Sequence, residues 1–93
     1  MTKFGAGPKY TDPVSGTEWA NEHTFHIAHW MLNDVQIYQN MRKFMEKFTG
    51  PIPYRAWIKE MGLVDGSTPD GWKLIADAVH YGELSEVMRA STI

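Results

Sequence analysis

Ninety-three residues make one domain, because a chain of this length cannot bury two separate cores. Hydrophobic residues make up 43% of the sequence and the formal net charge is -2, which excludes a wholly disordered chain and a large basic surface for nucleic-acid backbones. The absence of cysteine excludes disulfides, thiolate metal sites and cysteine nucleophiles, and it suits a reducing cytoplasm.

The sequence shows no membrane-spanning segment and no signal peptide. No stretch approaches the roughly 20 apolar residues that a transmembrane helix requires. Residues 1–8 lack the apolar run of a secretory signal. We therefore expect a cytoplasmic protein.

The first 16 residues are predicted to form an irregular N-terminal arm, ahead of a single helical domain over residues 17–93. Helix-breaking residues recur in this arm among few aliphatic side chains: Gly5, Gly7, Pro8, Pro13 and Gly16. Either the arm packs on the domain through Phe4, Tyr10 or Val14, or a partner orders it.

Bulky residues with helical spacing predict a first helix over 18–32. Thr24 is a candidate N-cap, because it precedes the densest part of this apolar pattern. Asn33-Asp34 then interrupts the pattern, and Asp34 is expected to cap the next helix because its carboxylate accepts free amide hydrogens. A structural hinge is the favoured interpretation of Asn33-Asp34, with a polar binding site as the alternative.

Two further helices are predicted from apolar periodicity and helix-end signals. Over 35–48, apolar side chains recur at three- and four-residue steps: Val35, Ile37, Tyr38, Met41, Phe44, Met45 and Phe48. Gly50 and Pro51 are expected to end this helix. A third, short helix should begin near Pro53, whose missing amide hydrogen costs nothing in a first turn, and should end at Gly62.

The segment after the third helix is ambiguous. Thr68 as a cap, followed by a proline, favours a helix over 69–80 that Gly82 stops. Gly71 weakens a first turn, so a short extended piece is the alternative.

One or two helical turns are expected over 83–89, where apolar residues lie on one side. The predicted fold class is therefore all-α (mainly α), a compact bundle of three to five short helices.

The most distinctive polar cluster consists of three histidines at three-residue spacing: His23, His26 and His29. On a helix each such step turns by about 60°, so only neighbouring pairs share a face. Together with Glu22 and a distant His80, the cluster offers ligands that suit zinc, although its spacing matches no known zinc motif. The favoured interpretation is that the histidines stack on Trp19 and Trp30 or cap the helix, so no metal and no cofactor is predicted. Their titration at about pH 6 to 7 would make the protein pH-sensitive.

No motif reaches the specificity of a catalytic signature, and we predict that the protein is not an enzyme. The carboxylate pairs Glu83 with Glu86 and Asp65 with Asp70 lie in exposed-looking turns, without an apolar pocket that would shift a pKa. Phosphate-binding glycine loops, nucleophile elbows and HExxH sequences do not occur.

The basic residues Arg42, Lys43 and Lys47, with Arg55, are the candidates for phosphate contacts. Because Glu46 lies among them, a solvated helix face is the favoured interpretation. We therefore expect no nucleic-acid partner, and a nucleic-acid accessory protein remains an alternative.

One pattern resembles that of a small uncharacterised protein family of phages and bacteria. It has the form N-x-x-T-[WF]-x4-W-x2-N-D-x3-Y and is carried here by Asn21, Thr24, Phe25, Trp30, Asn33, Asp34 and Tyr38. The downstream Thr68-Pro69-Asp70-Gly71 and Glu83-Leu84 resemble the family's later part, so the similarity covers residues 21–90. The chain departs from the family in having Phe25 instead of tryptophan, and in its histidines. The resemblance implies a phage or mobile-element accessory protein that acts on host machinery in the host cytoplasm, with no assigned activity.

The favoured function is a small helical interaction module that binds and modulates a host protein. Aromatic and methionine side chains are typical interface anchors, and the candidate binding residues, each of which can instead serve the core, are Trp19, Trp30, Tyr54, Trp57 and Trp72. Short aromatic-rich helices can also leave apolar surface for a homodimer. A metal- or ligand-binding protein built on the glutamate and histidine cluster is the main alternative.

Overall fold

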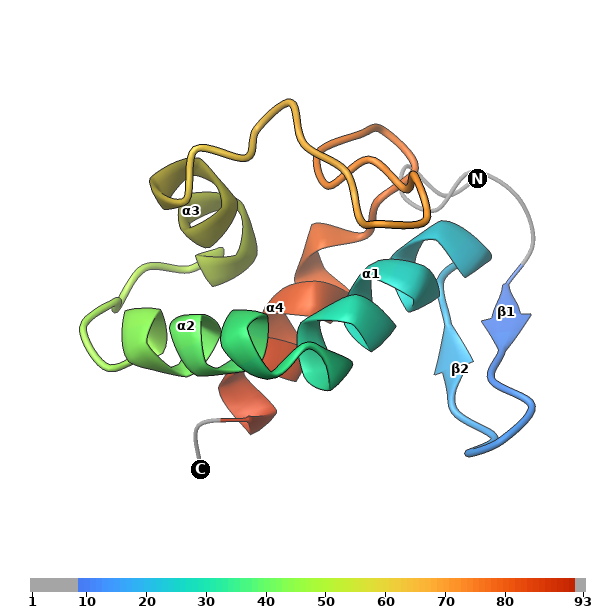
Figure 1. Cartoon of the computed structure of the whole chain (residues 1–93). Coiled ribbons are helices and arrows are strands. Elements are labelled where there is room, and N and C mark those ends of the chain that lie inside the picture. The colour runs from blue at the N-terminus through green and yellow to red at the C-terminus, as the bar shows by residue number, and fades with distance from the viewer. Residues whose placement is uncertain (1–8, 92–93) are drawn as a thin grey trace.

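The computed structural model describes residues 9–91 and shows four helices and one short antiparallel ribbon (Figure 1). The elements in chain order are β1 (Tyr10–Thr11), β2 (Glu18–Trp19), α1 (Glu22–Asn33), α2 (Val35–Met45), α3 (Pro53–Glu60) and α4 (Tyr81–Ala90). This confirms the prediction of a mainly helical fold. The prediction of an all-α fold is wrong, because β1 and β2 pair in a ribbon. The predictions for Phe4 and its neighbours lie outside the described residues. None of the helices in residues 9–91 is long and apolar enough to cross a membrane.

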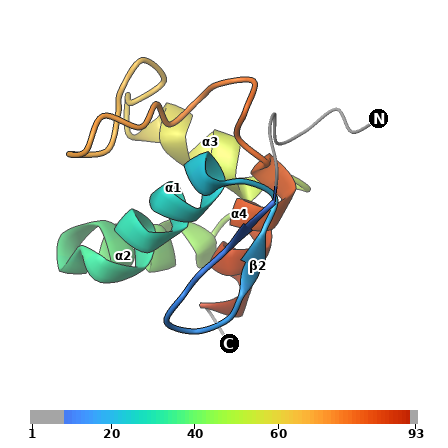
Figure 2. The ribbon, with the colours of Figure 1, turned by 90° about the vertical axis from the view of Figure 1, so that its right-hand side faces the viewer.

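The ribbon is a hairpin in which Tyr10 pairs with Trp19 and Thr11 pairs with Glu18. Asp12 closes its turn, because its carboxylate accepts hydrogen bonds from the Val14 amide at 3.0 Å and the Ser15 hydroxyl at 2.8 Å. These hydrogen bonds lower the pKa of Asp12, and the bond from the Val14 amide has the largest effect. Figure 1 shows the ribbon and α3 at opposite ends of the molecule, and in the view of Figure 2 the ribbon lies in front of α4.

Helix α1 begins at Glu22 rather than at residue 18, and its N-cap is Asn21 rather than Thr24. The Asn21 side chain accepts from the Thr24 amide at 2.8 Å and donates to the Ala78 carbonyl at 2.6 Å. The buried Thr24 hydroxyl accepts from the His80 amide at 3.0 Å. Both side chains are therefore fixed by residues more than fifty positions away, which a local pattern does not reveal.

Helices α2 and α3 begin where the sequence predicts. The Asp34 carboxylate caps α2 by accepting from the Ile37 amide at 3.1 Å, which confirms the predicted N-cap. Helix α2 ends at Met45, three residues early. Pro53 opens α3 as predicted, and Gly62, with φ of 71°, follows its end.

The predicted helix over 69–80 is wrong, because this segment is irregular in the structure. The Thr68 amide donates to the Trp72 carbonyl at 2.8 Å and the Thr68 hydroxyl accepts from the Trp72 amide at 3.1 Å, so the chain closes a turn. Gly71 adopts a φ of 93° within this turn, which a helix does not allow. Gly82 does not stop a helix but lies in the first turn of α4, whose N-cap is His80.

The core lies where α4 meets the other three helices. Fully buried side chains come from every helix and from the segment before α4: Ile27, Met31, Met41, Tyr54, Trp57, Ile58, Leu74, Val79, Leu84 and Met88. Burial of each such side chain contributes about 1.5 to 3 kcal/mol to the stability of the folded state. The irregular segment over 69–80 is thus part of the core, since it supplies Leu74 and Val79.

Tyr54 gives the core a measurable dependence on alkaline pH. Its hydroxyl donates to the Leu74 carbonyl at 2.7 Å, and burial, with the nearby Tyr81, raises its pKa well above the usual 10.0. The folded state binds this proton more tightly than the unfolded state does. The contribution of Tyr54 to the free energy of unfolding is therefore fully present below pH 10 and is lost as the pH rises above it. We expect the free energy of unfolding to decrease between about pH 10 and 11, and to decrease less in Tyr54→Phe. Urea unfolding at each pH measures this, with the half-buried Tyr38→Phe as control; an equal decrease in both variants would contradict it.

Candidate functional site

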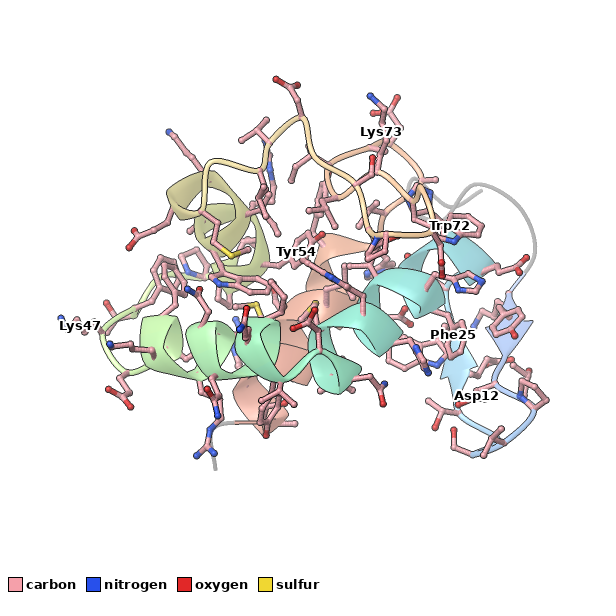
Figure 3. All side chains as sticks on the ribbon, viewed as in Figure 1. Asp12, Phe25, Lys47, Tyr54, Trp72 and Lys73 are labelled. Atoms are coloured by element: carbon pink, nitrogen blue, oxygen red, sulfur yellow. The ribbon has the colours of Figure 1, made fainter. Side chains whose placement is uncertain are left out.

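Two of the five predicted binding residues belong to the core. Tyr54 and Trp57 are fully buried, so the prediction that they form part of a contact surface is wrong. The Trp57 indole nitrogen donates to the Asn40 side chain at 2.8 Å, and Tyr54 donates inward to Leu74. Figure 3 shows Tyr54 in the interior between the helices. Both donors thus already have hydrogen-bond acceptors within the protein and are not available to a binding partner.

The other three predicted binding residues are half-buried and pack on neighbouring rings. The centroid of the Trp19 ring lies 6.2 Å from that of Phe25. The Trp30 ring lies 6.2 Å from the buried Trp57 ring. Trp72 stacks on His26 at 4.5 Å, with an angle of 12° between the planes. These contacts use ring faces that a partner would need, so we place the binding surface elsewhere.

The histidines do not assemble into a metal site. The His26 ring nitrogen lies 3.3 Å from the Glu22 carboxylate, and the His23 ring nitrogen lies 2.8 Å from the Lys73 carbonyl. His29 is exposed and packs on Phe25. No three histidine, aspartate or glutamate side chains come close enough to hold a metal ion anywhere in residues 9–91.

The proposed remote ligand of that set, His80, has another role. Its Nδ1 accepts a hydrogen bond from the Glu83 amide at 3.0 Å and caps α4. The predicted stacking of histidines on Trp19 and Trp30 is also corrected: His23 and His26 contact Trp72 instead. The irregular turn at residues 68–72 brings Trp72 onto α1.

A polar cleft of about 310 Å³ lies between the end of α1 and the turn at residues 68–70. It is lined by His26, His29, Trp30, Asn33, Asp34, Thr68, Pro69 and Asp70. The two segments that carry the family resemblance therefore meet here. Several of its polar groups already have structural bonds: Asn33 donates to the His29 carbonyl at 2.8 Å, and Asp34 caps α2. These bonds support the hinge interpretation of Asn33-Asp34.

The four carboxylates considered as acid and base pairs are bonded elsewhere or exposed. The Glu83 carboxylate accepts from the Ala20 amide at 2.9 Å, whereas Glu86 pairs with Arg89 at 2.6 Å. Asp65 and Asp70 are exposed.

A groove runs along α3 beside the segment that follows it, and we call it the α3 groove. It encloses about 320 Å³ and is lined by Ile52, Arg55, Ala56, Lys59, Val64 and Ile75. Ile52 and Val64 keep 41% and 46% of their surfaces exposed, so the groove presents two large aliphatic side chains to solvent. Arg55 and Lys59 add positive charge one helical turn apart.

A second hollow, the α2–α3 cleft, encloses about 530 Å³ and shares no residue with the α3 groove. It is lined by Asn40, Lys43, Phe44, Lys47, Phe48, Glu60 and Met61. The predicted basic residues are thus divided between the two hollows. Lys43 and Lys47 line the cleft and Arg55 lines the groove, whereas the Arg42 guanidinium lies 5.9 Å from the Tyr38 ring.

Sequence reasoning missed Ile52, Val64 and Lys59. A signal was present for each. Ile52 lies between two prolines, and Val64 precedes an Asp-Gly turn, so neither is placed on a buried helical face. Lys59 follows Arg55 by four residues and therefore shares its face of α3.

Comparison with known protein families, curated proteins and solved structures finds no match to this chain. The resemblance to a phage and bacterial family stays a prediction. The functional argument therefore depends on the surfaces described above.

Proposed function

We propose that this chain is a protein-binding module whose α3 groove receives an acidic, partly apolar segment of a partner. The observation that carries the proposal is the combination, in one groove, of exposed aliphatic side chains with two cations. In keeping with the phage resemblance, we propose a host protein as the partner.

The apolar part of the groove supplies binding free energy. Ile52 directly precedes α3, Val64 lies in a turn, and Ala56 and Ile75 complete the apolar lining. Covering the exposed parts of Ile52 and Val64 contributes about 1 kcal/mol each. Burial of a leucine, isoleucine or aromatic side chain of the partner in the groove would contribute a similar binding free energy.

The charge of the groove selects the partner. Arg55 and Lys59 are exposed, and within residues 9–91 neither forms an ion pair. The Arg55 guanidinium lies 5.3 Å from the centroid of the Tyr81 ring, which restrains the cation without neutralising it. Complementary carboxylates would speed association and fix the orientation of the bound segment.

Site-specific photo-crosslinking in the native cell tests this proposal. A benzophenone side chain at Ile52 or Val64 is expected to give one light-dependent adduct with a host protein, whose crosslinked segment is rich in aspartate or glutamate and contains apolar residues. The same group at Val14, which is 93% exposed at the far ribbon, is the control and should give no such adduct. Mass spectrometry identifies the crosslinked peptide.

Charge reversal supplies the second arm of this test. Arg55→Glu with Lys59→Glu should abolish the adduct, whereas Arg42→Glu with Lys73→Glu, matched in charge and exposed elsewhere, should preserve it. Adducts that are equal at Val14 would contradict the proposal. If the adduct contained nucleic acid or a second copy of the chain, the partner would not be a host protein, and the proposal would also be contradicted.

A further inference from the structure

The α2–α3 cleft has the features of a separate small-molecule site. Its volume of about 530 Å³ falls in the range of ligand pockets, roughly 300 to 1,000 Å³. It draws its lining from both helices and from the residues that end each of them. A ligand there would not compete for any residue of the α3 groove.

One wall of the cleft is a pair of stacked rings. The Phe44 and Phe48 ring centroids lie 5.0 Å apart, with 23° between their planes. Gly50 makes room for this arrangement, because a Cβ atom at that position would overlap the end of the Phe48 ring. Met61 lines the cleft from the end of α3. The wall is thus apolar and polarisable, which suits an aromatic ring.

The charge of the cleft is positive. Lys43 and Lys47 are both exposed and line it, and neither forms an ion pair among the described residues. Figure 3 shows Lys47 at the end of α2 that is far from α1. Glu60 is the single carboxylate of the lining, so two cations face one anion. Bringing two ammonium groups to one hollow costs repulsion that a bound anion relieves.

We infer that the α2–α3 cleft binds a planar aromatic anion, such as an aromatic carboxylate or a nucleotide. Its ring packs against the Phe44 and Phe48 wall and Met61, and its negative group lies between Lys43 and Lys47. Asn40 links the site to a reporter, because it lines the cleft and its side chain accepts the hydrogen bond from the Trp57 indole nitrogen.

Titration of the isotope-labelled protein with 2-naphthoate, followed by nuclear magnetic resonance, tests the inference. We expect saturable shifts of the Trp57 indole signal and of the amides of residues 43–48, while the indole signals of Trp19 and Trp72 stay in place. The neutral analogue 2-naphthalenemethanol should bind about tenfold more weakly, because it lacks the charge that the lysines attract.

Three variants separate the two parts of the site. Lys43→Gln with Lys47→Gln should weaken naphthoate binding about tenfold, whereas Lys9→Gln with Lys73→Gln removes the same charge elsewhere and should leave binding unchanged. Gly50→Ala should displace the Phe48 ring and weaken binding several-fold. Because that ring end is flexible, the fold should survive, which the dispersion of the amide spectrum reports.

A parallel titration with adenosine monophosphate distinguishes the two ligand sources. Tighter binding of the nucleotide assigns the site to nucleotides, and tighter binding of naphthoate assigns it to aromatic carboxylates. The inference is overturned if neither probe gives saturable shifts at residues 43–48, if the neutral analogue binds as tightly, or if loss of Lys43 and Lys47 has no effect.

Discussion

Trp57→Ala is expected to lower the free energy of unfolding by about 3 to 5 kcal/mol, the usual cost of truncating a buried aromatic side chain. Trp57 is fully buried, and its ring contacts the rings of Trp30 and Tyr54 at centroid distances of 6.2 and 6.4 Å. A domain of this size has a total stability towards the lower end of about 5 to 15 kcal/mol. The variant should therefore be partly unfolded at 37 °C, as circular dichroism during urea and thermal unfolding would show.

Two control variants accompany this prediction. Trp57→Phe keeps a buried ring but removes the indole donor to Asn40, and should cost less than the alanine variant. Val14→Ala changes a side chain that is 93% exposed and should stay within about 0.5 kcal/mol of the wild type. If Trp57→Ala unfolds at the same urea concentration as Val14→Ala, the position of Trp57 in the core is wrong.

Asn21→Ala is expected to cost about 2 to 3 kcal/mol, which exceeds the typical cost of an N-cap alone, about 1 kcal/mol. The additional cost comes from the Ala78 carbonyl, which loses its side-chain donor at 2.6 Å. Asn21 is only 4% exposed, so water does not easily replace that donor. Urea unfolding measures the total, and hydrogen exchange should show faster opening of the amides around residues 76–80.

Asn21→Asp separates the two roles of this side chain. Aspartate caps helices as well as asparagine does, but it has no amide group to donate to Ala78. If the second bond matters, Asn21→Asp will be destabilised despite its good cap. Asn33→Ala is the matched control, because Asn33 is exposed and bonds only within α1, so about 0.5 kcal/mol or less is expected. Full stability of Asn21→Asp would contradict the role assigned to the Ala78 contact.

Helices α2 and α3, and the later part of α4, could be predicted because their signals are local. Asp34 and Pro53 lie at the starts of two helices, and apolar periodicity follows each. The start of α1 and the segment over 69–80 could not be predicted in the same way. Trp19 pairs with Tyr10 in the ribbon instead of extending the helix, and Thr68 closes a turn on Trp72. In both places contacts outside the local pattern, or a side chain bonding to the backbone, decide the conformation.

The candidate surfaces were harder to predict, because large rings serve a core and an interface equally well. Tyr54 and Trp57 look like interface anchors in the sequence and are buried in the structure. The exposed apolar residues of the α3 groove are smaller and lie outside the helices, where periodicity carries no information. The sequence places Lys43 and Lys47 on one face of a predicted helix, but the cleft that they share also requires Glu60 and Met61 from the end of α3.

The bonds from Asn21 and Thr24 to Ala78 and His80 also constrain when the protein can fold. During synthesis, the first turn of α1 leaves the ribosome long before either of these partners has been translated. A nascent chain that ends before residue 78 would thus carry a frayed α1 and an incomplete core. Maturation of this domain is accordingly a late, concerted event, and stalled or truncated chains should be easy targets for proteases.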